Sequence, residues 1–140
     1  MRKIMGGISI VLALVIGILP AFTDCLSQGR SLELANGKTV PMKCHWTALA
    51  GVGAAVPLGL VGVFSITSKR KETFRTLGAS GAALGALAIG FPTALIGVCA
   101  NPMMLCNMLM RPGLVLSGGL AVVASLVILA GSRKDVEMAA

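Results

Sequence analysis

Charged and aromatic residues are scarce in this sequence. Only 12% of its 140 residues are charged and 4% are aromatic; it has one histidine, one tryptophan and no tyrosine. A soluble domain carries roughly 25% charged residues, so this composition excludes a soluble globular enzyme and a disordered tail. Hydrophobic residues make up 56% of the chain and lie in long uninterrupted blocks. Such blocks are typical of an integral membrane protein.

The net charge of +7 does not indicate a nucleic-acid partner. The basic residues flank the apolar blocks, and the chain has few aromatic side chains for base stacking, with one Trp, four Phe and no Tyr. A nucleic-acid-binding surface needs clustered Lys and Arg on one face. We therefore expect the charges to orient the chain in a lipid bilayer.

Four apolar segments are long enough to cross a membrane. A hydrocarbon core about 30 Å thick needs roughly 20 apolar residues of helix. The segments are residues 4–22, 46–67, 77–98 and 113–131, and none contains Asp, Glu, Lys or Arg. We predict an all-α integral membrane protein, a four-transmembrane-helix bundle forming one membrane domain over residues 1–140.

Basic residues in short loops favour the cytoplasmic side of a membrane. Eight Lys or Arg lie at the N-terminus, in the connector 68–76 (which contains Lys69) and in the C-terminal tail. The loops 23–45 and 99–112 hold four. We predict that both termini are cytoplasmic and that these two loops face outward.

Small residues recur at four-residue spacing on three of the segments. Such stripes let helix backbones approach closely in a membrane, so we expect them to form helix-packing faces. They are Gly51, Ala55 and Gly59, then Gly81 and Gly85, and finally Gly113, Ser117, Ala121 and Ser125.

The four segments also lack the residues of familiar membrane chemistry. All acidic residues and the single histidine lie outside them, whereas proton relays and ion-coupled transporters need ionisable groups within the membrane. No phosphate-binding or dinucleotide fingerprint is present. We expect no catalytic residue and no cofactor.

All four cysteines map to the two outward loops or their borders. They are Cys25, Cys44, Cys99 and Cys106. The compartment outside the cytoplasm is oxidising, and four cysteines allow three disulfide connectivities. Pairing within each loop is the simplest, so we predict Cys25–Cys44 and Cys99–Cys106, giving the bundle a small disulfide-linked extracytoplasmic cap.

Both loops contain turn signals. Residues seven apart on a continuous helix are roughly 10 Å apart, too far for a disulfide, so the second pair requires a turn at Asn101-Pro102. In the first loop, Asn36-Gly37 predicts a β-hairpin over residues 31–42.

Two other interpretations of the cysteines stay open. The layout is similar to that of small four-span thiol oxidases that pass electrons to quinone, although this chain has no Cys-x-x-Cys pair. A Cu(I) site is the second, because thiolates and thioethers are the soft ligands that select this ion. Candidate metal or redox residues are Met42, Cys44, His45, Met103, Met104 and Cys106.

Two motifs carry a resemblance that covers nearly the whole chain. Residues 42–47 read Met-Lys-Cys-His-Trp-Thr, and residues 91–99 read Phe-Pro-Thr-Ala-Leu-Ile-Gly-Val-Cys. The chain resembles a family of small bacterial and archaeal four-span membrane proteins of unknown function. The resemblance implies a prokaryotic cytoplasmic membrane and brings no activity. Independently of it, we expect Trp46 to anchor its helix at the membrane interface.

The sequence favours a non-catalytic role. We predict an accessory or assembly subunit of a larger membrane complex, whose partners are the lipid bilayer and another membrane protein or a second copy of the chain. The alternatives are a quinone-linked thiol–disulfide oxidoreductase and a Cu(I)-handling membrane protein.

Overall fold

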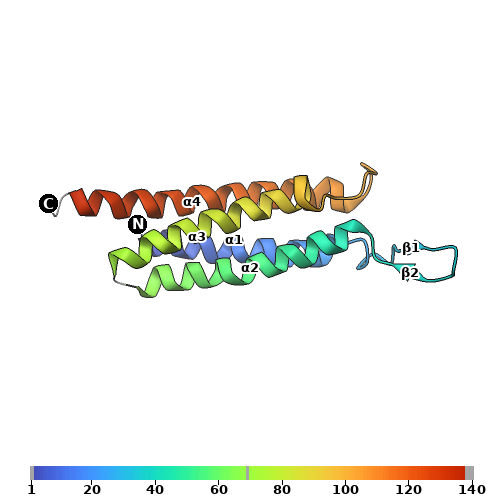
Figure 1. Cartoon of the computed structure of the whole chain (residues 1–140), viewed down its shortest axis with the longest axis horizontal. Helices are drawn as coiled ribbons and strands as arrows, with labels where there is room; N and C mark the ends of the chain where they lie inside the picture. Colours follow the sequence, from blue (N-terminus) through green and yellow to red (C-terminus); the bar gives the residue numbers. More distant parts are fainter. Residues whose placement is uncertain (1, 69, 138–140) are drawn as a thin grey trace.

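A computed structural model describes residues 2–68 and 70–137 and consists mainly of four long helices (Figure 1). They are α1 (Arg2–Thr23), α2 (Lys43–Thr67), α3 (Lys71–Gly90) and α4 (Arg111–Glu137). Four helices are long and apolar enough to cross a membrane, which confirms the predicted four-span membrane protein. Lys69 and residues 1 and 138–140 of the predicted domain lie outside the described residues.

Two short π-helical segments extend the second half of the chain. The segment η1 (Phe91–Leu95) continues α3, and η2 (Cys106–Met110) leads into α4. The last helical span therefore begins at Cys106, within the loop predicted over 99–112. Apolar residues continue through this part of the loop, so helical structure satisfies backbone groups that lipid would leave unpaired.

The helices pack as two antiparallel hairpins, α1 with α2 and α3 with α4. The contact between the two helices of each hairpin is larger than either contact that joins a helix of one hairpin to a helix of the other. One pair of glycines brings the backbones together in each hairpin. A Cβ on Gly6 would lie 2.9 Å from the carbonyl oxygen of Gly62, and one on Gly85 would lie 2.9 Å from that of Gly118. A side chain at these positions would force the helices apart.

The predicted small-residue stripes lie at helix contacts. The stripe on α2 faces α1, since Gly51 lies against Pro20 and Gly59 against Ala13. The stripe on α3 faces α4, and most of the α4 stripe is buried inside the bundle. The stripe residues are Gly51, Ala55 and Gly59 on α2, Gly81 and Gly85 on α3, and Gly113, Ser117, Ala121 and Ser125 on α4.

Both ends of the chain lie at one end of the bundle, and a β-hairpin projects from the other (Figure 1). The strands β1 (Leu32–Glu33) and β2 (Thr39–Val40) pair antiparallel. Gly37 adopts a φ of 74° in the turn between them, so the hairpin expected around Asn36-Gly37 is present. Which end faces the cytoplasm stays a prediction.

Candidate metal centre

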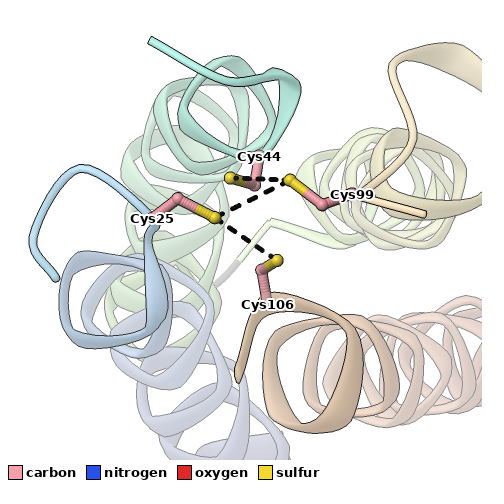
Figure 2. A group of neighbouring side chains, drawn as sticks. All are labelled: Cys25, Cys44, Cys99 and Cys106. Carbon is pink, nitrogen blue, oxygen red and sulfur yellow. Dashed lines mark hydrogen bonds between the residues drawn. The ribbon is translucent and has the colours of Figure 1, made fainter. Parts of the chain in front are cut away.

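The four cysteines meet at the end of the bundle that carries the β-hairpin. Cys25 follows α1, Cys44 lies in the first turn of α2, Cys99 follows η1 and Cys106 begins η2. All four Sγ atoms lie within 4.8 Å of one another, and Figure 2 shows them gathered in one space between the helices. Each helical hairpin therefore supplies two thiols to one cluster, which we call the four-cysteine cluster.

The four cysteines are free thiols, so the structure does not contain the predicted disulfide-linked cap. Two sulfur–sulfur contacts lie at 3.4 Å, for Cys44–Cys99, and at 3.5 Å, for Cys25–Cys106. Both contacts connect one hairpin to the other, whereas the predicted pairs lie within a hairpin. The sulfurs of the predicted pairs also lie within 4.8 Å of each other, so the disulfide connectivity stays a prediction.

The segment before Cys99 is held by backbone geometry and by one buried hydroxyl. Gly97 has a φ of 81°, a left-handed conformation that favours glycine. Its N–H donates to the Phe91 carbonyl at 2.9 Å. The fully buried Thr47 hydroxyl donates to the Gly97 carbonyl at 2.6 Å. These bonds tie the end of η1 to α2 and so place Cys99 beside Cys44.

Short turns position the other two loop cysteines. Beyond α1, the Arg30 N–H donates to the Cys25 carbonyl at 2.9 Å. Ahead of η2, the Met103 N–H donates to the side chain of Asn101 at 3.0 Å. The chain therefore reverses at Asn101-Pro102, as the sequence predicted.

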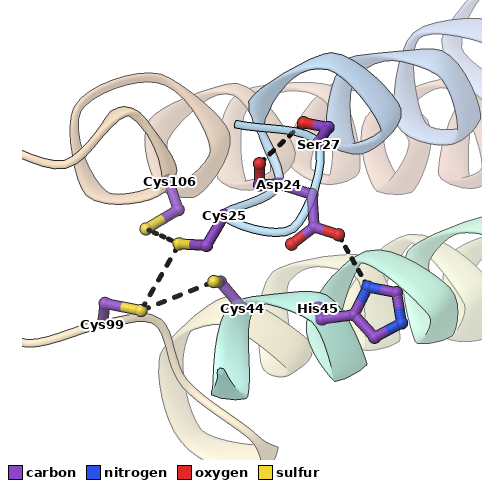
Figure 3. Close-up of polar contacts among 7 residues, drawn as sticks. All are labelled: Asp24, Cys25, Ser27, Cys44, His45, Cys99 and Cys106. Carbon is purple, nitrogen blue, oxygen red and sulfur yellow. Dashed lines mark hydrogen bonds and ion pairs between the residues drawn. The ribbon is translucent and has the colours of Figure 1, made fainter. Parts of the chain in front are cut away.

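A hydrogen bond between two side chains joins the end of α1 to the start of α2. His45 Nδ1 lies 2.6 Å from Asp24 Oδ2. Figure 3 shows this pair beside the cluster, with the His45 ring directed away from the sulfurs. The pair links the residue before Cys25 to the residue after Cys44. The sequence marked His45 only as a candidate ligand, and its carboxylate partner was not predicted, although the neighbours Asp24-Cys25 and Cys44-His45 at the two loop ends were a usable signal.

Burial differs among the four thiols. Cys25 is 3% exposed and Cys44 and Cys106 are fully buried, whereas Cys99 is partly exposed. Burial, together with its thiol neighbours, raises the pKa of Cys25 well above its ordinary value. Burial alone would also raise the pKa of Cys99, but hydrogen bonds from the neighbouring thiols stabilise its thiolate and leave its pKa below the ordinary value. Cys99 is therefore the more readily ionised of these two thiols.

The predicted methionine candidates separate into two groups. The Met42 Sδ lies 3.8 Å from the Cys99 Sγ, and Met104 is partly buried against the same hydrophobic core. Met103 is 82% exposed, so its side chain is not buried with the cysteines. Trp46 is 57% exposed at the start of α2, and its role as an interface anchor stays a prediction.

The spacing of the sulfurs is suited to a metal ion. In a tetrahedral site with metal–sulfur bonds of about 2.3 Å, neighbouring sulfurs are about 3.8 Å apart. Three of the Sγ pairs are separated by 3.4, 3.5 and 3.7 Å, and all four Sγ atoms lie within 4.8 Å of one another. A disulfide would need one pair at about 2.05 Å. The cluster thus has nearly the dimensions of a four-thiolate metal site.

Fold and site together define a small four-span membrane protein with a cysteine cluster at one end of its bundle. The chain belongs to the family described as Domain of unknown function (DUF4418), whose model matches residues 3–130. This match confirms the resemblance to a small four-span family of unknown function. No curated protein and no solved structure matches the chain.

Proposed function

We propose that the protein is a non-enzymatic membrane protein that binds one soft metal ion in the four-cysteine cluster. The observation that carries this proposal is the convergence of four sulfurs within 4.8 Å of one another from four separate segments. Four thiolates prefer soft or borderline ions such as Zn(II) and Cu(I) over Mg²⁺ or Ca²⁺.

The chemistry around the cluster supports a sulfur-only site. The nearby carboxylate of Asp24 is paired through Oδ2 with His45, which occupies Nδ1 of that imidazole. The other oxygen of Asp24, Oδ1, is buried without a hydrogen-bond partner, while Met110 and Leu114 are fully buried in the hydrophobic core that contains the cysteines. Such an environment excludes water and restricts access to a bound ion.

A metal ion here would join the two helical hairpins. Cys25 and Cys44 belong to the first hairpin, Cys99 and Cys106 to the second. Because an ion bound only by the folded chain adds its binding free energy to folding, metal binding would stabilise the packing of one hairpin against the other.

Metal binding is compatible with the predicted role as an accessory subunit. Large apolar side chains are exposed on the outer face of α4, including Leu116, Leu120 and Val123. Lipid and a partner helix both suit such a face, so purification in mild detergent with mass spectrometry of co-eluting chains tests the subunit role separately. A protein that elutes alone would contradict it.

Cadmium titration tests the metal proposal. The full-length protein, reduced and metal-free in detergent, is titrated with Cd(II) while thiolate-to-metal charge-transfer absorption is followed in the ultraviolet. We expect saturation at one ion per chain. Cys44→Ser and Cys106→Ser should each weaken binding by about 100-fold, since metal-ligand substitutions have large effects, and Met103→Leu should leave it unchanged. Absence of a charge-transfer band in the reduced wild-type protein would overturn the proposal.

Thiol–disulfide exchange is a second candidate, favoured by the position of Cys99. Its Sγ lies 3.4 Å from that of Cys44 and 3.7 Å from that of Cys25, so it can form a disulfide with either. Forming one disulfide oxidises two thiols and passes two electrons and two protons to an oxidant, either a protein disulfide or a quinone. Peptide mapping of unreduced protein from native membranes should then find Cys44–Cys99 in place of Cys25–Cys44.

A further inference from the structure

The two hairpins share a short motif that the four-cysteine cluster alone does not explain. A Met-x-Cys motif stands where the second helical segment of each hairpin begins, as Met42-Lys43-Cys44 at α2 and as Met104-Leu105-Cys106 at η2. Both methionines are partly buried and pack against the core that contains the cysteines. Each hairpin therefore brings a thioether as well as two thiols to the same region.

Met42 is the methionine in direct contact with a thiol. Its Sδ lies 3.8 Å from the Cys99 Sγ, a separation like those between the cysteine sulfurs themselves. Cys99 is also the only partly exposed thiol among the four cysteines, the others being buried. The thioether of Met42 and the accessible thiol of Cys99 therefore lie together where an ion from solution would first meet the cluster.

Charge distinguishes the ions that this cluster could hold. Zn(II) with four thiolates carries a net charge of about −2, and an uncompensated buried charge is costly. Among the described residues the side-chain hydrogen bonds of the four thiols are with other sulfurs, and the neighbouring Lys43 and Arg111 are exposed. Cu(I) needs fewer thiolates, and a thioether adds a ligand without adding charge.

We infer that the ion is Cu(I) and that the Met42 thioether binds it beside the Cys99 thiolate. This inference rests on the proposed function and identifies its ligand. It assigns Met42 a role in choosing the ion, because a thioether is a good ligand for Cu(I) and a poor one for Zn(II). Met104, the equivalent residue of the second hairpin, is partly buried against the core that contains the cysteines.

Competition titrations of the full-length protein test this assignment. The reduced, metal-free protein in detergent is titrated under anaerobic conditions with Cu(I) against bicinchoninate, and separately with Zn(II) against a chromophoric chelator. The variants are Met42→Leu and the matched control Met103→Leu, which alters an exposed methionine at the same end of the molecule. Leucine keeps the approximate volume of methionine, and Zn(II) binding through the cysteines reports that the site is folded.

We expect Met42→Leu to weaken Cu(I) binding at least tenfold and to change Zn(II) binding less than twofold, with Met103→Leu altering neither. If Met42→Leu weakened the binding of Cu(I) and of Zn(II) equally, or changed neither, the role of Met42 would be overturned. Preferential retention of Zn(II) by the wild-type protein would overturn the choice of ion and leave the metal centre intact. Failure to bind Cu(I), Zn(II) or Cd(II) would overturn the metal centre and this inference together.

Discussion

The two helical hairpins share a plan but reach the four-cysteine cluster in different ways. In the first, regular helices α1 and α2 are joined by a long loop with a β-hairpin, and Cys25 and Cys44 lie at the helix ends. In the second, Cys99 and Cys106 are close in sequence, and π-helical segments flank the short connection on both sides. Both hairpins nevertheless hold a contacting glycine pair and a Met-x-Cys motif.

The difference shows that a short connection between two helices requires irregular helix ends, whereas a long loop does not. A long loop lets two regular helices end wherever the cysteines are needed. A short connection gives no such freedom, so the turns of η1 and η2 and the left-handed Gly97 reorient the chain instead. π-Helical turns are often found at functional sites, and here they lie next to two of the four thiols.

Substitutions at the glycine contacts should give the largest loss of stability, and each should affect one hairpin and not the other. A Cβ on Gly118 would lie 2.8 Å from the Gly85 carbonyl oxygen, whereas one on Gly119 would meet nothing within 4 Å. Gly118→Ala should lower the free energy of unfolding by about 2–3 kcal/mol through overpacking. Gly119→Ala should leave it unchanged or raise it by up to about 1 kcal/mol, because alanine favours helix.

Unfolding in detergent, followed by circular dichroism, measures both effects. In the first hairpin, Gly62→Ala should behave like Gly118→Ala, and Gly53→Ala like Gly119→Ala, since a Cβ on Gly53 meets no atom within 4 Å. Similar stabilities for Gly118→Ala and Gly119→Ala would contradict the backbone contact.

The buried Thr47 hydroxyl donates a hydrogen bond that connects α2 to the segment that carries Cys99. Thr47→Val keeps the shape of the side chain and leaves the Gly97 carbonyl without its donor, which should cost about 2 kcal/mol of stability. The control is Thr67→Val, because Thr67 is exposed and bonds only within its own helix. An equal effect of the two substitutions would show that the bond to Gly97 does not hold the segment.

The thiols of the two hairpins should differ in reactivity. In the metal-free protein, Cys99 is partly exposed with a lowered pKa, whereas Cys25 is buried with a raised pKa. Iodoacetamide reacts with thiolate, so near neutral pH Cys99 should be alkylated at least about tenfold faster than Cys25, and both rates should rise with pH. Mass spectrometry of timed samples measures the order, and faster labelling of Cys25 would contradict the arrangement.

Of these regions, the β-hairpin of the first loop should contribute least to stability and to metal binding. Gly37 has a φ of 74° and a Cβ there would meet no atom within 4 Å, so Gly37→Ala introduces only backbone strain of about 1 kcal/mol. Its two strands are exposed, and we expect Cd(II) affinity to stay unchanged. A loss of Cd(II) binding in this variant would show that the β-hairpin helps to form the cluster.

Sequence reasoning identified the parts of this molecule that depend on local pattern. Apolar blocks predicted the four spans because lipid leaves a backbone few alternatives to helix, and Asn36-Gly37 predicted its turn. The cluster was beyond that reasoning, because the meeting of Cys25, Cys99 and Cys106 depends on how the two hairpins pack. The partnership of Asp24 with His45 and the bond from Thr47 to Gly97 likewise join segments that no local pattern connects.

X-ray absorption at the zinc edge of the zinc-loaded full-length protein tests the central claim most directly, because it counts the ligands of the bound ion. The account predicts four sulfur neighbours at about 2.3 Å and no nitrogen or oxygen ligand, with fewer sulfurs in Cys106→Ser. A mixed shell containing nitrogen or oxygen in the wild-type protein would contradict the claim that the four cysteines form a single metal site.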